Sequence, residues 1–354
     1  MRIGIDARLY GAKHGGIGRY IEELILNLLK IDHQNQYIFF VYNNKDRRNI
    51  ASRRDFACNV STAQWRFIHA PHRWYSLKEQ LLMPGLIKKA KIDLMHFPHF
   101  NVPLTYNNPY VVTIHDLIIH HFPDERATTL PRRMYQLKLW GYKKVVKHAV
   151  ENAKAIITPS EFTKKDILRF YNIDIDKVKV VYEGVSDLSS KFKVQSSKFQ
   201  FKIKSYGNYL LYVGSAYPHK NLEKLIDAFA ILRQKYKLTD LKFVLVGKKD
   251  YFYNQLQKKI ISQYPNIPIP NIIFYSHAAD SELVELYQNA KMFVFPSLRE
   301  GFGLPPLEAM SFGLPVVASQ VASIPEVCGG AAIYFDPADH ANIAEKIYQA
   351  HNNK

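Results

Sequence analysis

The sequence predicts an α/β protein made of two doubly wound domains that face a cleft. Short apolar runs alternate with stretches of helical periodicity, which is typical of parallel strands joined by helices. The 354 residues exceed the usual size of one hydrophobic core, and 47% of them are apolar. The alternation stops over residues 186–207, which are rich in Ser and Lys, and then restarts. We therefore expect a linker there, with domains at 1–186 and 187–354.

Within the first domain, apolar runs of strand length alternate with longer amphipathic stretches. The N-cap residue Ser160 and the Pro at the start of the 131–152 stretch are typical of helix starts. Strands are expected at 3–6, 37–42, 94–97, 110–114, 155–158 and 178–181. Helices are expected at 17–31, 76–90, 131–152 and 161–171.

The second domain repeats this alternation. Strands are expected at 209–213, 242–246, 272–274 and 292–295, with a further apolar run at 315–318, and helices at 222–236, 281–289 and 342–351. Ligands of open α/β sheets bind beyond the carboxyl ends of the strands, so the loops that follow these strands are the first places to search for a site.

Composition narrows the class of protein. No apolar run approaches the 18–20 residues that span a bilayer, and the N-terminus lacks the apolar stretch of a signal peptide. Cys58 and Cys328 are far apart and have no zinc-ligand spacing, so a reducing cytoplasm is expected. The net charge of +17 is concentrated in the first half, which indicates an acidic partner or a solvated basic face.

Residues 300–319 are the most informative segment. Glu300 and Glu308 lie eight positions apart, and glycines and prolines between them predict a tight turn followed by a helix start near Pro306, with Glu308 in the first turn. Free helix N–H groups bind anions, and carboxylates accept hydrogen bonds from hydroxyls. A sugar nucleotide combines a diphosphate with polyol groups, so these features predict a sugar-nucleotide ligand. The alternative is that Glu308 compensates the helix dipole and Glu300 is solvated.

This segment resembles the E-x7-E motif of retaining glycosyltransferases of family 4, and the likeness extends over nearly the whole chain. The resemblance implies a GT-B fold of two Rossmann-like domains. It also implies that Glu308 binds the ribose, while Glu300 and the amides around Phe302, Gly303 and Leu304 hold the donor sugar. GGIGRY and HKNL are similar to mannosyltransferase sequences, so GDP-mannose is the donor we expect, with no other cofactor.

Two further loops could contact phosphate. Gly15, Gly16 and Gly18 stand between the first strand and the first helix, where their amides could cradle an anion or provide a flexible turn. Lys220 stands at a helix start, where a cation opposes the dipole, which suggests a bound anion. In the family this second loop supplies basic residues to the diphosphate; here Ser215 and His219 occupy the other positions, and His219 replaces the usual Arg.

His115 follows the apolar strand VVTI and matches a family histidine near the donor sugar; a hydrogen-bonded core histidine is the alternative. We expect Asp116 to brace the following turn. His120 and His121 diverge as neighbours, and no convincing DxD loop occurs, so we expect no metal requirement. Catalysis is assigned to His115, Glu300 and Lys220, by stabilisation of the leaving diphosphate.

The resulting interpretation is a cytoplasmic, retaining, metal-independent hexosyltransferase with a saccharide or lipid-linked acceptor in cell-surface glycan synthesis. In the helix at 131–152, apolar residues stand between basic ones, so this helix could contact the anionic inner face of the cytoplasmic membrane. A sugar-nucleotide epimerase and a basic nucleic-acid-binding protein remain as alternatives. Because only one helical stretch follows residue 339, we expect the family's final crossing helix to be missing from this chain.

Overall fold

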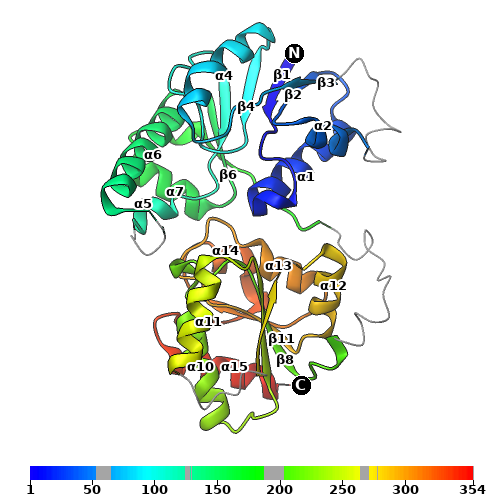
Figure 1. Cartoon of the computed structure of the whole chain (residues 1–354), viewed down its shortest axis with the longest axis vertical. Coiled ribbons are helices and arrows are strands. Elements are labelled where there is room, and N and C mark those ends of the chain that lie inside the picture. Colours follow the sequence, from blue (N-terminus) through cyan, green and yellow to red (C-terminus); the bar gives the residue numbers. More distant parts are fainter. Residues whose placement is uncertain are drawn as a thin grey trace. The chain divides into compact units, whose positions relative to one another are not determined.

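The computed structural model describes residues 1–52, 65–123, 128, 130–186, 203–263, 271–276 and 278–353. They divide into two compact units, each a parallel sheet covered by helices (Figure 1). Unit 1 comprises Met1–His120 with Leu130–Glu183, and unit 2 comprises His121–Thr129 with Gly184–Lys354. Cys58 lies outside the described residues. The predicted domain boundary lies between residues 186 and 187. Residues 187–202 also lie outside the described residues, so this boundary stays a prediction.

Among its described residues, unit 1 has a seven-stranded sheet in the order β3-β2-β1-β4-β5-β6-β7, with every strand parallel to its neighbours. The strands are β1 (Arg2–Asp6), β2 (Gln36–Val41), β3 (Trp65–His69), β4 (Leu94–Phe97), β5 (Tyr110–Thr113), β6 (Ala155–Thr158) and β7 (Val178–Val180). The order reverses between β1 and β4, so a crevice opens beyond the carboxyl ends of these two strands.

Helices cover both faces of this sheet. Alternate residues of β2 belong to different hydrophobic clusters: Phe39 packs with the helices α1 and α2, whereas Phe40 packs with α4, α6 and α7. Both faces are therefore buried, which explains the nearly continuous apolar runs. The helices are α1 (Gly15–Ile31), α2 (Asn44–Ala51), α4 (Leu77–Lys89), the short α5 (Ile118–His121), α6 (Arg132–Asn152) and α7 (Glu161–Phe170).

Unit 2 has a six-stranded parallel sheet among its described residues, in the order β10-β9-β8-β11-β12-β13, and its order reverses between β8 and β11. The strands are β8 (Tyr209–Val213), β9 (Lys242–Gly247), β10 (Ile272–Ser276), β11 (Met292–Phe295), β12 (Val316–Ser319) and β13 (Ala332–Phe335). The helices are α10 (Leu222–Gln234), α11 (Tyr251–Gln263), α12 (Asp280–Asn289), α13 (Leu304–Ser311), α14 (Ile324–Cys328) and α15 (His340–Asn352).

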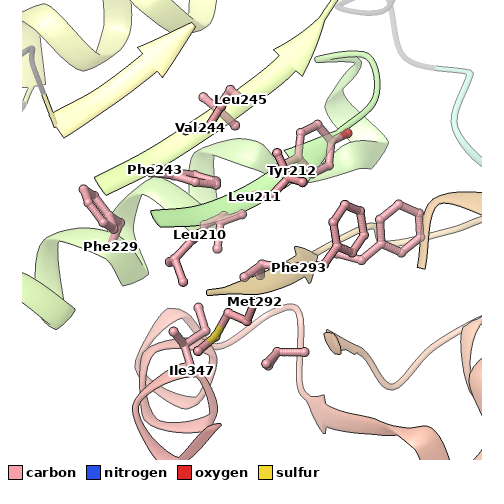
Figure 2. Close-up of a cluster of buried hydrophobic side chains, with 14 of the residues drawn as sticks. Leu210, Leu211, Tyr212, Phe229, Phe243, Val244, Leu245, Met292, Phe293 and Ile347 are labelled. Atoms are coloured by element: carbon pink, nitrogen blue, oxygen red, sulfur yellow. The ribbon is translucent and has the colours of Figure 1, made fainter. Parts of the chain in front are cut away.

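The three central strands of unit 2 form the middle of its core. Figure 2 shows residues of β8, β9 and β11 with Phe229 of α10 and Ile347 of α15 packed near them. Phe229, Phe243 and Phe293 are completely buried. The ladder between β8 and β11 sets their spacing, and this core holds both strands, and hence the loops that follow them, in place.

The structure confirms most predicted elements and corrects several. Ser160 and Ser76 both accept a backbone N–H bond as N-caps, and Asp116 accepts one from Ile118. The predicted linker, 186–207, extends too far at its C-terminal end: Ile203 and Tyr206 are buried and belong to the core of unit 2. Helices α2, α5, α11 and α14 and strands β3 and β13 were not predicted. The sequences of α2, β3 and α11 carry charged or polar residues that weaken the apolar signal. No helix in the described ranges is long and apolar enough to cross a membrane.

Candidate active site

The loop between β11 and α13 carries Glu300, and α13 itself carries Glu308. Gly303 has φ +105°, a left-handed conformation that favours glycine, and α13 begins at the next residue, Leu304. The prediction of Glu308 in the first turn is wrong, because a start at Leu304 places Glu308 in the second turn. Glu300 and Glu308 are both 8% exposed. Buried carboxylates require partners, and the structure supplies one to each.

Glu300 is paired with Lys220. The ammonium group lies 2.7 and 2.9 Å from the two carboxylate oxygens, although the residues are eighty positions apart in the chain. The side chains are 17% and 10% exposed. The pair forms because Lys220 follows β8 and Glu300 follows β11, and these adjacent strands meet at the point where the sheet order reverses. The sequence indicated both residues, but it did not indicate their contact.

Asn221 joins the two loops that carry this ion pair. It has φ +59°, an unusual conformation for a residue other than glycine, and it stands directly before α10. Its side-chain amide donates to the backbone oxygens of Pro296 at 3.1 Å and Pro337 at 2.8 Å. The N–H of Leu298 also donates to the carbonyl of His219 at 2.8 Å. Sequence analysis missed this role, for which the only local signal was an Asn immediately before a helix.

Two further side chains hold Glu308 and the loop that carries Glu300. The Tyr287 hydroxyl donates to Glu308 Oε2 at 3.0 Å, and its ring stacks on Phe312. Ser323, fully buried, donates to the backbone oxygens of Glu300 at 3.0 Å and Phe302 at 2.8 Å. These bonds fix the backbone of the segment that leads into α13. Neither residue stands near the motif in sequence, so sequence reasoning had no signal for them.

The β8 loop places the remaining predicted residues of unit 2. The backbone oxygen of Ser215 accepts a bond from Tyr212 at 2.8 Å, and a Cβ at Gly214 would lie 2.6 Å from that tyrosine hydroxyl. Burial, followed by the charge of Lys220, lowers the pKa of His219 to about 4. His219 is therefore neutral near pH 7, and Lys220 supplies the positive charge of this loop.

In unit 1 the three glycines are not a loop before the helix, as predicted, but the first turn of α1, which begins at Gly15 rather than Ile17. Gly15 and Gly16 are exposed, and the N-cap residue His14 makes no side-chain capping bond. Close packing requires a glycine at position 18, because a Cβ there would lie 2.0 Å from the carbonyl oxygen of Gly11. The helix start therefore presents N–H groups that could donate hydrogen bonds to an anion.

His115 is held at both ring nitrogens. Nδ1 lies 3.2 Å from Glu183 Oε1 and Nε2 lies 2.9 Å from the carbonyl oxygen of Pro98. Burial lowers the pKa of His115, but the hydrogen bond and charge of Glu183 outweigh it, so the net pKa is raised. Both partners are acceptors, which suits a doubly protonated imidazolium. Within the described residues, no group of three or more His, Cys, Asp or Glu side chains could hold a metal ion.

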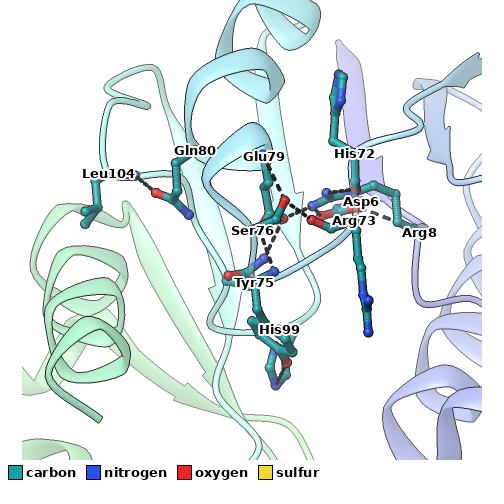
Figure 3. Close-up of polar contacts among 11 residues, drawn as sticks. Asp6, Arg8, His72, Arg73, Tyr75, Ser76, Glu79, Gln80, His99 and Leu104 are labelled. Carbon is teal, nitrogen blue, oxygen red and sulfur yellow. Dashed lines mark hydrogen bonds and ion pairs between the residues drawn. The ribbon is translucent and has the colours of Figure 1, made fainter. Parts of the chain in front are cut away.

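A buried polar network that the sequence analysis did not identify lies beyond β1 and β4 (Figure 3). Arg8, 1% exposed, donates to Asp6 at 2.6 Å and 2.8 Å and to Glu79 at 2.5 Å. Asn101 donates to the same oxygen of Glu79. Asp6, Arg8 and Asn101 also line a pocket together with Leu9, Ile21, Trp74, Pro98 and His99. The pocket occupies the reversal point of this sheet, where a ligand site is expected.

Two family models match the chain. The model described as Glycosyltransferase Family 4 matches residues 14–187, and that described as Glycosyl transferases group 1 matches residues 193–354. The O-antigen chain mannosyltransferase RfbU of Salmonella typhimurium is 30% identical over 79% of this chain and 69% of its own length. The O-antigen chain mannosyltransferase B of Escherichia coli is 29% identical over 95% and 86%.

Solved structures agree on the fold. Sucrose-phosphate synthase from Thermosynechococcus elongatus has a TM-score of 0.70 at 18% identity and covers all of this chain and 90% of its own. An Anabaena protein, HepE, in complex with UDP and glucose has a TM-score of 0.69 at 17% identity, covering 99% and 90%. None of these comparisons favours an epimerase. The sequence relatives and both matched models establish that the chain belongs to the glycosyltransferases of family 4 and has their GT-B fold.

Proposed function

We propose that this glycosyltransferase moves a hexose, with mannose as the first candidate, from a nucleoside diphosphate sugar to a saccharide or lipid-linked acceptor in cell-surface glycan synthesis. The observation that carries the proposal is the Lys220–Glu300 pair at the reversal point of the unit 2 sheet. It puts a cation for phosphate next to a carboxylate for sugar hydroxyls. The names of the two O-antigen relatives support mannose, and hence GDP-mannose as donor.

Different residues of unit 2 bind different parts of the donor. Glu308, oriented by Tyr287, binds the ribose hydroxyls, while Glu300 and the amides of Phe302, Gly303 and Leu304 bind the sugar. Lys220, with Ser215 and neutral His219 as hydrogen-bonding groups, binds the diphosphate. Stabilising the charge that develops on the departing diphosphate is the main source of catalysis.

Residues of unit 1 complete the proposal. In unit 1, the α1 start at Gly15, Gly16 and Gly18 offers N–H groups to an anion, and the raised pKa of His115 favours a cationic hydrogen-bond donor. The acceptor attacks the same face that the diphosphate leaves, so the anomeric configuration is retained. We propose that the reaction needs no metal ion, because the cationic groups of the protein neutralise the leaving group.

A panel of sugar nucleotides tests the proposal. GDP-mannose should raise the melting temperature more than UDP-glucose or UDP-N-acetylglucosamine, and transfer to an acceptor should persist in EDTA. Nuclear magnetic resonance of the product should show the donor's anomeric configuration. A product of inverted configuration, or activity lost in EDTA and restored by Mg²⁺, would overturn the mechanism. Isomerisation of the sugar nucleotide without an acceptor would favour the epimerase.

We also propose that the enzyme works in the cytoplasm at the inner face of the membrane, where a lipid-linked acceptor would be presented. The basic, partly apolar helix α6 supports this location. Fractionation of cells that express the tagged chain tests it. Recovery in the membrane pellet that is reversed by high salt is expected, and recovery only in the supernatant at low salt would contradict it.

A further inference from the structure

Glu183 is a buried carboxylate in a stretch of chain whose neighbouring residues are exposed. It follows β7 and is the last residue of unit 1, since unit 2 resumes at Gly184. Tyr182 is 58% exposed and Gly184 is exposed, whereas the Glu183 side chain is only 12% exposed. A carboxylate leaves water only where a partner compensates it. Here the partner is His115, whose Nδ1 lies 3.2 Å away although it stands 68 positions earlier in the chain.

The two partners of the His115 ring determine which of its forms fits. The carbonyl oxygen of Pro98, 2.9 Å from Nε2, can only accept a hydrogen bond, and so can the ionised carboxylate of Glu183 at Nδ1. A neutral imidazole has one N–H and would satisfy one acceptor, whereas the imidazolium satisfies both. Glu183 is the charged partner of the two. Loss of its charge should therefore favour the neutral ring more than loss of any other single contact.

The other titratable groups around the ring have smaller effects. Burial lowers the pKa of His115, and the hydrogen bond and charge of Glu183 raise it more than the charge of Asp116 does. His96 and His99 face the ring from β4 and from the segment that follows it. Burial, with the charge of His115 as a second cause, lowers their pKa values to about 4 and about 3, so both are neutral near pH 7. They therefore do not compete with His115 for a proton.

Two helices complete the surroundings of His115 with uncharged groups. The Tyr20 ring of α1 lies 4.7 Å from the His115 ring and nearly perpendicular to it, and its hydroxyl is 3.1 Å from Thr113 Oγ1. Burial raises the pKa of Tyr20 to about 12, so this hydroxyl stays neutral near pH 7. From α7, the Thr163 hydroxyl donates to the backbone oxygen of His115 at 3.3 Å. These contacts hold the ring in place, and Glu183 supplies the charge.

We propose that Glu183 is a positioning residue for His115: its carboxylate fixes the ring and keeps both ring nitrogens protonated during sugar transfer. The inference rests on the proposed function, in which His115 is a cationic hydrogen-bond donor. The Nε2–H passes from the Pro98 carbonyl to an anionic oxygen of the substrate, because a hydrogen bond to a charged acceptor is about twice as strong as one to a neutral acceptor. The Nδ1–H stays on Glu183 and preserves the ring orientation. Glu183 itself contacts no substrate.

Nuclear magnetic resonance of the ligand-free full chain, labelled with ¹⁵N-histidine, tests the effect on the ring. The His115 signals are assigned by their loss in His115→Gln. The Glu183→Gln variant keeps the shape of the side chain and removes its charge, so the midpoint of the His115 titration should fall by about one to three pH units. The matched control is Glu151→Gln, which neutralises a partly exposed glutamate of α6 and should leave the midpoint unchanged. Equal midpoints in the parent and Glu183→Gln overturn the proposal.

The pH dependence of kcat tests the role in turnover. The rate should fall on the alkaline side as His115 loses its proton, and in Glu183→Gln this fall should occur at lower pH, by the same amount as the titration midpoint. Glu183→Asp keeps the charge and should restore part of the alkaline activity. A substitution that only destabilised unit 1 would lower the melting temperature and the rate at every pH. An alkaline fall at the same pH in the parent and Glu183→Gln overturns the proposal, whatever the rate.

The outcome is separable from that of the proposed function, because the titration of His115 needs no substrate. If no sugar nucleotide is bound or turned over by any form of the protein while the midpoint still shifts in Glu183→Gln, the proposed function fails and the control of His115 by Glu183 stands. If GDP-mannose is turned over but neither the midpoint nor the alkaline fall moves, the assignment of Glu183 fails alone.

Discussion

At the scale of single residues, the proposed donor site contains a cation that is already paired. Lys220 contacts both oxygens of Glu300, so a diphosphate that binds Lys220 must compete with a carboxylate. The residue roles proposed above therefore interact: a ligand anion at Lys220 releases Glu300 for the sugar hydroxyls. Substitutions at these positions should have effects of opposite sign on different ligands.

The Glu300→Gln variant should bind nucleoside diphosphate about three- to tenfold more tightly, because Lys220 loses its internal anion; this corresponds to roughly 0.7–1.4 kcal/mol. Turnover of the sugar nucleotide should fall at the same time. Isothermal calorimetry with GDP and GMP, together with initial rates, separates the effects. Weaker GDP binding in Glu300→Gln would show that the carboxylate does not compete for Lys220.

The Glu308→Ala variant should weaken binding of the nucleoside itself, because a charge-assisted acceptor of roughly 1.5–3 kcal/mol is lost from the ribose hydroxyls. The loss should be the same for guanosine, GMP and GDP. Glu345→Ala, an exposed glutamate of α15, is the matched control and should have no effect. Unchanged calorimetric affinity in Glu308→Ala would remove it from the ribose site.

At the scale of elements, the site depends on two loops and on the residues that join them. Asn221 bridges the β8 loop to the segments that follow β11 and β13, and it does so from a left-handed backbone conformation. Asn is one of the few residues other than glycine that adopt this conformation readily. Its side-chain bonds and its conformation can be separated by substitution.

The Asn221→Gly variant keeps the backbone conformation and loses the two amide bonds, whereas Asn221→Ala loses both. We expect Asn221→Gly to lower the free energy of unfolding by about 1–3 kcal/mol, and Asn221→Ala to cost roughly 1 kcal/mol more. Urea unfolding of unit 2, monitored by hydrogen exchange, measures the order of stability of the parent and the two variants. Equal stability of parent and Asn221→Gly would mean that the bridging bonds contribute nothing; GDP affinity should fall in the same order.

At the scale of the whole molecule, the three tryptophans give a selective readout, because Trp65, Trp74 and Trp140 all belong to unit 1. Their fluorescence should therefore follow the unfolding of this unit alone. Unit 1 also contains a buried histidine, His96, which is 6% exposed and bonds to Thr113 at 2.9 Å. Burial, with the charge of His115 as a smaller cause, lowers the pKa of His96 from 6.5 to about 4.

This shift predicts the direction of a pH dependence. Between pH 6.5 and about 4 the unfolded chain binds a proton at His96 and the folded chain does not, so the stability of unit 1 falls as the pH falls. At pH 4.5 the contribution is roughly 2.5 kcal/mol. Urea unfolding monitored by tryptophan fluorescence at pH 7 and 4.5 should show a smaller decrease in His96→Gln. An equal decrease would assign the effect to other groups.

The sequence by itself determined the fold class, most elements and the candidate glutamates. Glycines, prolines and N-cap serines act locally, so Gly303, Pro306 and Ser160 predicted a turn and helix starts from their neighbours alone. Family resemblance added roles for Lys220 and His115. Elements whose apolar pattern is diluted, such as β3 and α11, were missed because periodicity is the only signal for them.

Only the tertiary structure decided which of these residues meet. Lys220 reaches Glu300, Tyr287 reaches Glu308, and Arg8 reaches Glu79 across 80, 21 and 71 positions of the chain. Such contacts follow from strand order and from the point where that order reverses, and neither is a local property of the sequence. The physical reason is that propensity and periodicity act over a few residues, whereas the partners of a buried charge are chosen by how the whole sheet packs.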